Sequence, residues 1–296
     1  MRTVVSGSSG LVGSALVPFL AEAGWEVGRV VRGEAGPGDL AWDPETGTLD
    51  AATLSAMDAV VHLAGENLVG LWTEAKKRRI RDSRLNGTRL LSESLAKLAL
   101  PPKVLVAASA IGYYGDRGDE ELDESSSPGT GFLAEVCQEW EAATHPAREA
   151  GIRVVNLRIG VVLTPRGGAL GKMLGPFKAG LGGRMGSGKQ WQSWIALDDL
   201  LGAILHTLVA DQLAGPVNAV APNPVTQSDF ARTLGKVLRR PTYAAMPAFV
   251  ARLAFGEMAD EMLLASARVV PRELLSSGYA FRHPTLGAAL TPLVLE

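Results

Sequence analysis

The sequence predicts an α/β protein: a Rossmann-type, doubly wound parallel sheet followed by a smaller, mostly helical C-terminal lobe on the substrate side. Three observations predict this fold. Strand-like and helix-like patterns alternate through roughly the first 160 residues, as in a parallel sheet. A glycine-rich turn joins the first strand to the first helix. The alternation ends where glycines gather between residues 167 and 188, so the second part of the chain must be built differently.

The first strand is predicted at residues 3–5, where β-branched residues precede the glycine-rich turn. Residues 14–23 carry apolar side chains at helical spacing and are expected to form a helix that Gly24 ends. Strands are then predicted at residues 26–31 and 59–63, which are rich in valine. This order of strand, helix and strand is the pattern of a parallel sheet.

Four further elements complete the alternating part of the chain. A long, basic helix is expected at residues 73–98, before a pair of prolines. A buried strand follows at residues 103–108, a helix at residues 133–150 and a strand at residues 153–157. The chain up to this point therefore has the alternation of a complete dinucleotide-binding domain.

We accordingly assign residues 1–158 to a dinucleotide-binding Rossmann domain and residues 159–296 mainly to the substrate-side lobe. The glycine-rich stretch 167–188 is predicted to be a loop rather than a regular element. The strand expected near residues 216–222 fits the first sheet better than a sheet of its own. The remaining predictions are helices at residues 198–209 and 229–238 and a helical, proline-punctuated C-terminal segment.

The composition fits a globular protein and argues against several other classes. Of the 296 residues, 47% are hydrophobic, and the formal net charge is −2, so no general attraction to nucleic acid is expected. The single cysteine, Cys137, excludes an internal disulfide framework, and the histidines are too scattered for a metal site. No apolar run is long enough to span a bilayer and no signal peptide is evident, so a cytoplasmic protein without a membrane partner is expected.

The strongest local signal for a ligand is the spacing Gly7-x-x-Gly10-x-x-Gly13 between the first strand and the first helix. Gly7 permits the tight turn, Gly10 lets the backbone approach a pyrophosphate, and Gly13 lets the helix pack close to the strand. The N–H groups at the start of the helix then face the phosphates. This context predicts a dinucleotide site.

The residue that ends the second strand indicates which dinucleotide binds. NAD-specific sites commonly place an acid there for the ribose hydroxyls, whereas a basic residue can pair with a 2′-phosphate. Here the strand ends at Arg32, so NADP(H) is predicted. Glu34 lies close enough in sequence to be the acidic alternative.

The glycine spacing and the segment Asp58–Gly65 resemble the extended short-chain dehydrogenase/reductase superfamily. Four motifs resemble, more specifically, its atypical epimerase-like family, which has its own C-terminal segment and is sometimes labelled cell-division inhibitor, a label that nothing in the residues supports. These motifs are Leu63–Asn67, Ser109–Gly115, Arg158–Leu163 and Gly188–Ile195. The resemblance covers essentially the whole chain and implies a Rossmann fold that binds NADP(H).

The resemblance and the cofactor loop together imply a set of cofactor contacts near the carboxyl ends of the strands. No metal is expected among them. The expected contacts are Gly7, Ser9, Gly10, Leu11, Val12, Gly13, Arg32, Leu63, Ala64, Gly65, Arg84, Ala108, Ser109, Gly160 and Val161.

The catalytic pattern of the superfamily is incomplete in this chain. In most members a serine holds the substrate oxygen, a tyrosine exchanges its proton, and a lysine four residues later lowers the pKa of that tyrosine. Ser109 matches the serine. The tyrosine is expected near Phe132 or Leu133 and the lysine near Val136 or Cys137, and neither residue type is present there. The usual mechanism therefore cannot be assumed.

Three residues are the candidate substitutes for the missing pair. Tyr113 and Tyr114 follow Ser109 on the loop that leaves the strand, where ligands of open parallel sheets gather. Glu66 follows the strand at residues 59–63. Each candidate has a structural alternative: the tyrosines can be packing residues with satisfied hydroxyls, and Glu66 can be a solvated or paired loop carboxylate.

Two other features concern the substrate side. The segment Gly186–Trp194 combines glycines with amide and indole side chains, a mixture suited to a polar ligand with flat parts. A structural loop anchored by tryptophan fits this segment equally well. Asp198 and Asp199 are interpreted as the N-terminal cap of a helix rather than as metal ligands.

The sequence therefore favours an NADP(H)-dependent oxidoreductase or epimerase that acts on an unidentified small polar metabolite, with nucleotide-linked molecules among the candidates. The alternative is a catalytically silent regulator or scaffold that binds NADP(H). The absent tyrosine and lysine favour the second hypothesis, and the retained Ser109 favours the first. The sequence does not determine the oligomeric state.

Overall fold

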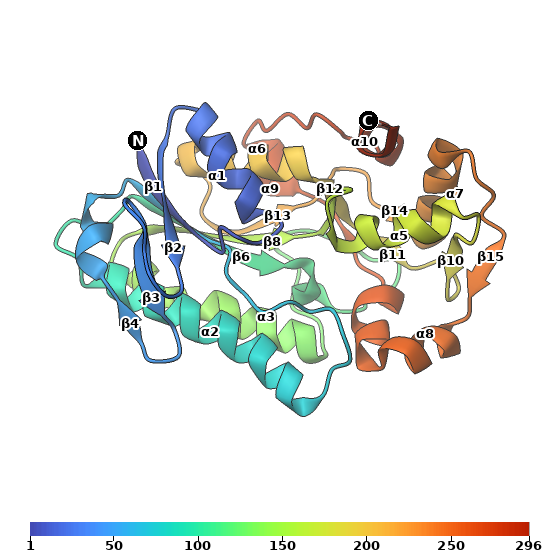
Figure 1. Cartoon of the computed structure of the whole chain (residues 1–296), viewed down its shortest axis with the longest axis horizontal. Coiled ribbons are helices and arrows are strands. Elements are labelled where there is room, and N and C mark those ends of the chain that lie inside the picture. The colour runs from blue at the N-terminus through green and yellow to red at the C-terminus, as the bar shows by residue number, and fades with distance from the viewer. Residues whose placement is uncertain (296) are drawn as a thin grey trace.

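A central eight-stranded sheet organises the protein, which a computed structural model describes at residues 1–295 (Figure 1). All neighbouring strands are parallel except the last pair, which is antiparallel. This arrangement confirms the predicted doubly wound parallel sheet. In spatial order the strands are β13 (Gly215–Ala219), β8 (Arg153–Ile159), β6 (Val104–Ala110), β5 (Ala59–His62), β1 (Arg2–Ser6), β2 (Glu26–Val31), β3 (Leu40–Asp43) and β4 (Thr48–Leu49).

Helices cover both faces of this sheet. Successive side chains of a strand point to opposite faces. Val5 of β1 accordingly packs in one apolar cluster with α1 and α6, and its neighbour Val4 packs in a second cluster with α2 and α4. Figure 1 shows these two layers above and below the sheet. The helices are α1 (Gly13–Glu22) and α6 (Leu197–Val209) on one face, and α2 (Glu74–Ala96), α3 (Phe132–Ala142) and α4 (His145–Glu149) on the other.

The chain reverses its direction of travel across the sheet at β1, whose two neighbours are β2 and β5. From β1 the chain continues to β2 and β3 on one side, and it later returns to β5 and β6 on the other. The loops after β1 and β5 therefore leave in opposite directions and open a crevice, which is where doubly wound sheets bind ligands. The predicted cofactor loop lies at this crevice.

Residues 167–188 do not form the continuous loop that their glycines predict. The first half is a helix, α5 (Gly168–Lys178). Leu170 and Phe177 lie two helical turns apart on one face of this helix and are both buried in the apolar cluster of the second lobe. Burial of this face outweighs the low helix propensity of glycine, and this is why the prediction was wrong.

The second lobe combines short strand pairs with helices, so it is less purely helical than the sequence suggested. The expected strand near residues 216–222 is β13, at the edge of the large sheet. No helix within residues 1–295 is long and apolar enough to cross a membrane. The strand pairs are β9 (Val161–Leu163) with β12 (Trp194–Ala196), β10 (Gly183–Met185) with β15 (Ala244–Met246), β11 (Trp191–Gln192) with β14 (Val225–Thr226), and β7 (Glu121–Leu122) with β16 (Arg268–Val269). The remaining helices are α7 (Gln227–Leu238), α8 (Ala248–Phe255), α9 (Arg272–Ser276), α10 (Leu286–Leu295), and the short helices η1 (Ala51–Ala56), η2 (Ile111–Tyr114) and η3 (Ala259–Leu264), the last of which is a π-helix.

Candidate functional site

The turn between β1 and α1 has the geometry that the glycine spacing predicts. Gly7 has a positive φ of 69°, and a Cβ on it would lie 2.7 Å from the carbonyl carbon of Leu63. A Cβ on Gly13 would overlap the carbonyl oxygen of Gly7. The packing of the protein itself therefore requires both glycines, one for a tight turn and one for close contact between helix and strand.

Gly10 differs from these two glycines because the fold does not require it. It is exposed, as is Ser9, and the only atom near a built Cβ is the Gly7 carbonyl oxygen at 3.2 Å. α1 begins at Gly13 without a side-chain cap, and the N–H groups of Leu11, Val12 and Gly13 have no hydrogen-bond partner among the described residues, so they are available to an anion. Gly10 thus leaves open the space that a phosphate group needs.

Glycines also bring the second lobe close to this loop. A Cβ on Gly167 or on Gly168 would lie 3.2 Å from a methyl group of Leu11. Gly160, which follows β8, is packed more tightly than Gly167 and Gly168, because a Cβ on it would lie 2.7 Å from Cγ1 of Val220. Gly160 and the adjacent Val161, two predicted cofactor contacts, therefore lie at the edge of the sheet from which the cofactor loop also leaves.

The carboxyl ends of β1 and β5 are fastened together by a buried Ser6–His62 pair. The backbone N–H of Leu63 donates to Ser6 Oγ at 3.2 Å, and Ser6 Oγ lies 2.6 Å from His62 Nδ1. Burial lowers the pKa of His62 to about 4, so the ring is neutral, and its tautomer decides whether Nδ1 or the serine hydroxyl donates. This pair underlies the loop of Leu63, Ala64 and Gly65, and the sequence analysis did not identify it, because a serine and a histidine 56 residues apart carry no motif.

Arg32 lies where the sequence places it, directly after β2. Together with Gly33 and the β3–β4 hairpin it lines an open cleft of about 610 Å³. Asp43 in this cleft accepts the N–H groups of Glu45 and Thr46, which hold the pKa of its carboxyl below the usual value, and the charge of Arg32 adds to this effect. Glu34, the acidic alternative, is exposed and is not among the residues that line the cleft.

Arg84 is a half-buried cation without an ion pair among the described residues. Its Nη1 donates to the carbonyl oxygen of Ile80 at 3.0 Å, and its Cζ lies 5.0 Å from the ring centroid of Trp140. Burial lowers its pKa from the ordinary arginine value. A Cβ on Gly65 would lie 3.3 Å from Cζ, so the guanidinium is directly beside the loop after β5. The charge of Glu66 acts on Arg84 from outside ion-pair distance, so the guanidinium has no direct anionic partner and can accept an anionic ligand at this place.

Glu66 is already committed to a lysine. Its Oε1 lies 2.6 Å from Nζ of Lys76 and 3.9 Å from Nε of Arg79. The hydrogen bond from Lys76 is the main reason why the pKa of Glu66 lies below its ordinary value. Glu66 is therefore a paired loop carboxylate, and an ionised carboxylate has no proton to donate as a general acid.

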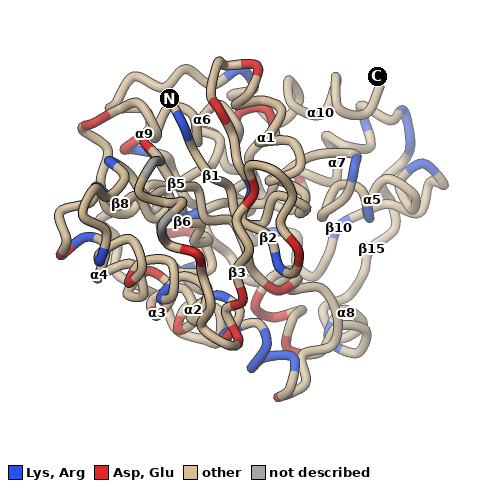
Figure 2. Tube along the Cα trace, turned by 60° about the vertical axis from the view of Figure 1, so that its left-hand side comes forward, with Lys and Arg blue, Asp and Glu red and all other residues tan. Residues whose placement is uncertain are grey.

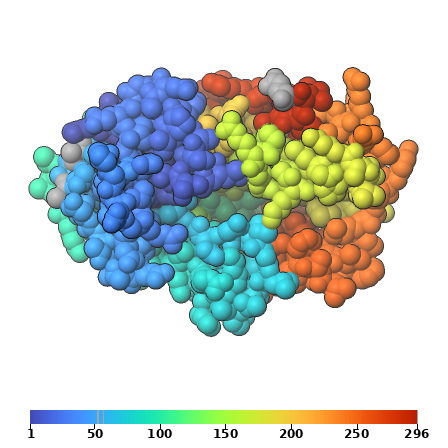
Figure 3. Space-filling view, in the orientation of Figure 1, coloured from blue at the N-terminus to red at the C-terminus, as the bar shows by residue number. Residues whose placement is uncertain are grey.

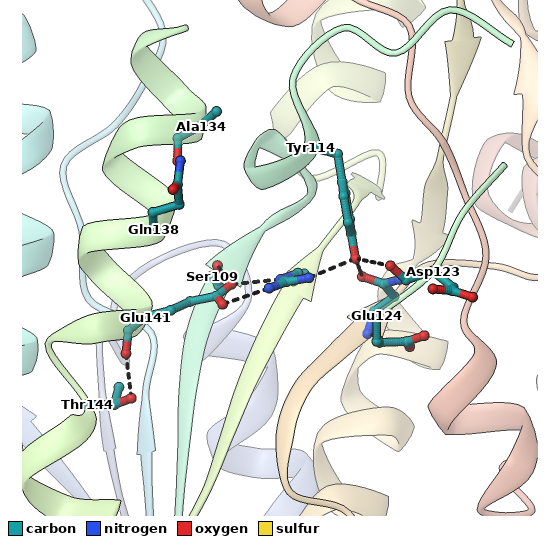
Figure 4. A network of polar contacts seen from close by, with 10 residues as sticks. Ser109, Tyr114, Asp123, Glu124, Ala134, Gln138, Glu141 and Thr144 are labelled. Carbon is teal, nitrogen blue, oxygen red and sulfur yellow. Dashed lines mark hydrogen bonds and ion pairs between the residues drawn. The ribbon is translucent and has the colours of Figure 1, made fainter. Parts of the chain in front are cut away.

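Ser109 belongs to a buried polar network that crosses the sheet (Figure 4). Its hydroxyl donates to Glu141 Oε1 at 2.7 Å. Both carboxylate oxygens of Glu141 also accept from Arg158, each at 2.8 Å. Arg158 in turn donates to the hydroxyl of Tyr114 at 3.0 Å, and Tyr114 donates to Oδ1 of Asn218 at 2.8 Å.

This network occupies the polar atoms of Ser109 and Tyr114. Tyr114 is fully buried, and burial raises the pKa of its hydroxyl to about 12. Its hydroxyl also lies 3.0 Å from the carbonyl oxygen of Asp123. The arrangement of Tyr114 is that of a packing residue with a satisfied hydroxyl, and the predicted catalytic role of Ser109 would require its bond to Glu141 to be exchanged.

Tyr113 is the candidate whose hydroxyl has no hydrogen-bond partner in the part of the chain described. Its ring is half-buried and stacks on the guanidinium of Arg158, whose Cζ lies 3.4 Å from the ring centroid. The ring of Tyr114 meets it edge to face at 5.3 Å. The ring of Tyr113 is therefore held firmly while its hydroxyl remains available.

The positions at which the superfamily has its tyrosine and lysine are apolar and packed. The ring of Phe132 lies 5.4 Å from that of Trp72, and Leu133 joins the same cluster. Val136 and Cys137 are buried on the inner side of α3. Burial raises the pKa of the Cys137 thiol to about 12, so this cysteine is chemically inert.

The C-terminal segment closes over the start of α3, which the sequence analysis did not predict. The two carboxylate oxygens of Glu261, on η3, accept the N–H groups of Phe132 and Leu133, both at 3.1 Å. A side chain on Gly131 would overlap this carboxylate. A cap donated by a residue about 130 positions away leaves no local signature at the helix start, where capping rules look for the cap.

The segment Gly186–Trp194 is largely a structural anchor. Nε2 of the buried Gln190 donates to the carbonyl oxygens of Met185 and Leu263, each at 3.1 Å. Trp194 is fully buried. Trp191 is half-buried, and its Nε1 donates to Oδ1 of Asp119 at 2.8 Å, so it presents the one indole of this segment that a ligand can reach.

The aspartates at the start of α6 do not cap it in the way predicted. Ala196 precedes the helix without a side-chain cap, and Asp198 and Asp199 both lie in its first turn. Asp199 is buried, and its carboxylate accepts the N–H groups of Arg282 and His283 at 2.7 and 2.9 Å. It therefore fastens the C-terminal segment to α6. Residues 1–295 contain no group of histidine, cysteine or acidic side chains arranged to hold a metal ion.

The predicted contacts converge on one face of the molecule. Figure 3 shows this face hollowed between the dark-blue cofactor loop, the cyan start of α2 and the yellow-green region of α5. The loops after β1 and β5 reach the hollow from the sheet, and the buried Ala108 lies within β6 below.

The sequence of this chain is similar to family models and to known proteins along nearly its whole length. Residues 3–219 match the model of the NAD dependent epimerase/dehydratase family, and residues 246–293 match a domain of unknown function, DUF1731. An epimerase family protein of Mycobacterium bovis, Mb2239, is 45% identical over 97% of this chain and 95% of its own length. The human epimerase family protein SDR39U1 is 40% identical over 99% of this chain and its full length.

Two solved structures are similar over nearly the whole chain. The crystal structure of human SDR39U1 (isoform 2) with NADPH has a TM-score of 0.91 at 37% identity and covers 100% of this chain and 99% of its own. A nucleoside-diphosphate sugar epimerase from Corynebacterium glutamicum has a TM-score of 0.83 at 40% identity; the match covers 99% of this chain and 58% of that one.

Proposed function

The chain belongs to the NAD dependent epimerase/dehydratase family, and on this premise we propose that it binds NADP(H) and acts as an oxidoreductase or epimerase on a small polar metabolite. The observation that carries the proposal is the combination of an open glycine with unpaired cations at the crevice. Gly10 leaves space that the fold does not need, and Arg84 lies half-buried beside Gly65 with no ion pair within residues 1–295.

These residues fit the phosphates and riboses of a dinucleotide. The N–H groups at the start of α1 hold the pyrophosphate, and Arg32, at the end of β2, pairs with the 2′-phosphate. When bound, NADP(H) supplies the hydride that an oxidoreductase or epimerase moves. The crystal structure of the human relative with NADPH supports this choice of cofactor.

Arg84 compensates for the missing lysine. The buried Cys137 is one of the two positions near which that lysine is expected, and it lies close enough for the charge of Arg84 to act on its thiol. The positive charge that the superfamily draws from α3 is therefore supplied by α2. An arginine cannot exchange protons at neutral pH, so this residue binds and orients but does not act as an acid or base.

Tyr113 is the residue that moves the proton in this proposal. Ser109, Tyr114 and Glu66 all have their polar atoms engaged, whereas the hydroxyl of Tyr113 has no partner in the described chain. The guanidinium of Arg158 stacks against its ring and holds the ring in place. The half-buried ring of Trp191 offers a flat surface for a ring on the substrate, and the nucleoside-diphosphate sugar epimerase from Corynebacterium glutamicum supports a nucleotide-linked substrate.

A catalytically silent, NADP(H)-binding regulator is the second candidate function. The observation that favours it is the closure of the reacting half: the superfamily's tyrosine is expected near Phe132 or Leu133, and Glu261 accepts the N–H groups of both residues.

Titration with both cofactors and a turnover assay test the proposal together. The wild type is expected to bind NADPH more tightly than NADH. Arg84→Ala is expected to lower the affinity for both cofactors by roughly tenfold or more, because a charge-assisted hydrogen bond is lost. Arg89→Ala, five residues further along α2 and exposed, is the control and should bind as the wild type does. Equal binding by Arg84→Ala and Arg89→Ala would contradict the role of Arg84.

Hydride transfer is then measured with a panel of nucleotide-linked sugars and small carbonyl compounds. Tyr113→Phe is expected to slow turnover by about 10²-fold or more without weakening NADPH binding, whereas Tyr114→Phe should act mainly on stability. NADPH binding without transfer to any compound of the panel would favour the silent regulator instead.

A further inference from the structure

One end of the molecule carries an excess of positive charge that the net charge of −2 hides. Segments 164–192 and 225–246 contain nine lysines and arginines and one acid, Asp229. All nine basic residues are exposed, and Figure 2 shows them in blue around α5, β10 and α7. We call this surface the basic end. Its residues are Arg166, Lys172, Lys178, Arg184, Lys189, Arg232, Lys236, Arg239 and Arg240.

The charges of the basic end are hardly neutralised by the protein. Arg232 pairs with Asp229 at 3.3 Å, and none of the other eight forms an ion pair with any residue in the described range 1–295. Arg184 donates only to the carbonyl oxygen of Ser187. Like charges that lack ion-pair partners and gather on one surface repel one another. The basic end therefore attracts an anionic partner.

Large apolar side chains project from the same end. Tyr243 is 94% exposed and Leu181 is 71% exposed. Their chain segments lie together because the next residues pair in a strand ladder, Gly183 with Ala244. Side chains of this size are seldom left in water in such a group without a partner.

α8 continues this apolar surface. It begins directly after β15 and Pro247, and its Phe249 and Leu253 are 69% and 85% exposed. These two residues are four positions apart, so they lie on one face of the helix. Ala248, at the start of the helix, approaches Gly186, which keeps α8 beside the basic end.

We propose that the basic end binds the surface of a membrane that contains anionic lipids. The lysines and arginines meet the headgroup phosphates, while Tyr243 and the exposed face of α8 enter the boundary between headgroups and acyl chains. Cations beside protruding apolar side chains are the combination that such a surface requires. The proposal is independent of the proposed function.

The apolar side chains distinguish lipid from the other possible partners. A nucleic acid could stack its bases on Tyr243 and Phe249, but it would leave the exposed Leu181 and Leu253 in water, since aliphatic side chains do not stack on bases. A second copy of the chain would bring two positively charged ends together, which repel each other. An anionic lipid surface offers phosphates to the basic side chains and an apolar layer to the aliphatic ones.

The sequence analysis expected no membrane partner because it found no apolar run long enough to span a bilayer and no signal peptide. Neither ground applies to this kind of binding. Peripheral binding requires neither a net positive protein nor a transmembrane helix, because only the local charge within a Debye length of the surface acts on the lipid. The basic end becomes visible only when β10 and β15 bring its two segments together.

Co-sedimentation with vesicles tests the proposal. The wild-type protein is mixed with vesicles of phosphatidylcholine alone, or with about 30% phosphatidylglycerol, at about 0.1 M salt. It is expected to sediment with the anionic vesicles and not with the neutral ones, and a several-fold rise in salt is expected to release most of it.

Two variants and one matched control locate the surface. Lys178→Glu/Arg240→Glu is expected to weaken binding to anionic vesicles by roughly tenfold or more, and Phe249→Ser/Leu253→Ser is expected to weaken it by at least about threefold. The control reverses two exposed, unpaired arginines on α2 and α4, in Arg89→Glu/Arg148→Glu, and should bind as the wild type does. Circular dichroism and thermal unfolding confirm that each variant is folded.

Three results would overturn the proposal. The first is no sedimentation with anionic vesicles. The second is equal loss of binding in Lys178→Glu/Arg240→Glu and in the control, which would show a general charge effect. The third is tight binding of a single-stranded oligonucleotide, or a dimer in light scattering that Phe249→Ser/Leu253→Ser abolishes, in protein that does not bind the vesicles.

Discussion

The cofactor half and the reacting half of the crevice are built in opposite ways. Around the loops after β1 and β5, Gly10 leaves space free and Arg32 and Arg84 carry charges without ion-pair partners in residues 1–295. Around the ends of β6 and β8, the polar atoms of Ser109 and Tyr114 are all engaged. One half is prepared for a ligand, and the other is occupied by its own side chains.

This difference shows that binding and chemistry can diverge separately on one fold. The glycine loop and its cations depend on the phosphates and riboses of the cofactor, which are the same for every reaction. The serine, tyrosine and lysine of the superfamily depend on the substrate, and two of the three are absent here. The family assignment therefore predicts the cofactor more securely than the reaction.

The largest expected effect lies in the reacting half. Glu141→Ala leaves the buried Arg158 unpaired and removes the acceptor of Ser109, so we expect the free energy of unfolding to fall by roughly 3–5 kcal/mol. NADPH affinity should change little. Chemical denaturation and cofactor titration of the same preparation measure both.

Glu139→Ala is the matched control for this prediction. Glu139 lies two residues before Glu141 on the same helix and pairs with the partly exposed Arg81. Removing its carboxylate should lower the free energy of unfolding by less than about 1 kcal/mol. A similar small cost for Glu141→Ala would show that the network around Ser109 is not structural.

The next expected effect is a pH dependence of stability that comes from the buried Ser6–His62 pair beneath the cofactor half. His62 is neutral in the folded protein, with its pKa lowered to about 4 by burial, whereas its ordinary value is 6.5. Its contribution to stability is therefore complete above pH 6.5 and is lost as the pH falls toward 4, by a total of about 3 kcal/mol.

Denaturation curves between these pH values test this. His62→Phe should lose less stability than the wild type on acidification, while His145→Gln on α4, whose histidine is exposed, should follow the wild type. Parallel curves for the wild type and His62→Phe would mean that the histidine is not the titrating group.

Gly10→Val separates cofactor binding from folding. Its side chain would enter the space reserved for a phosphate, so we expect NADPH affinity to fall by roughly 100-fold, equivalent to about 2.7 kcal/mol. The melting temperature of the free protein should change by only a few degrees, since the only near contact is one carbonyl oxygen. Gly13→Val, in contrast, should unfold the protein, and retained NADPH binding by Gly10→Val would show that the loop is only a turn.

The smallest expected effect is at the boundary with the C-terminal segment. Glu261→Ala removes the carboxylate that caps α3 and should lower the free energy of unfolding by about 1 kcal/mol. Asp260→Ala, the neighbouring acid in a surface pair with Arg252, is the control. If the two variants are equally stable, the cap does not hold the start of α3.

The sequence predicted the sheet, the cofactor loop and the position of Arg32, because these depend on local periodicity and on glycine spacing. It did not reveal that Ser109 is bound by Glu141, since the two residues meet only when α3 packs on the sheet. The helix α5 was missed for a similar reason: only the tertiary core shows that Leu170 and Phe177 share a buried face.

The C-terminal segment was the least predictable part of the molecule. Its contacts join residues far apart in sequence, such as Glu261 with Leu133 and Gln190 with Leu263. No spacing rule connects such pairs, and a π-helix has no distinct composition by which η3 could have been found. Long-range hydrogen bonds of this kind can be identified only in the folded structure.

A crystal structure of the protein with NADP⁺ tests the central claim most directly. The account predicts that the guanidinium of Arg84 lies within hydrogen-bond distance of the cofactor, while the hydroxyl of Ser109 still donates to Glu141. The result that would contradict it is a bound cofactor with Arg84 turned away and Ser109 released from Glu141 to face the nicotinamide ring.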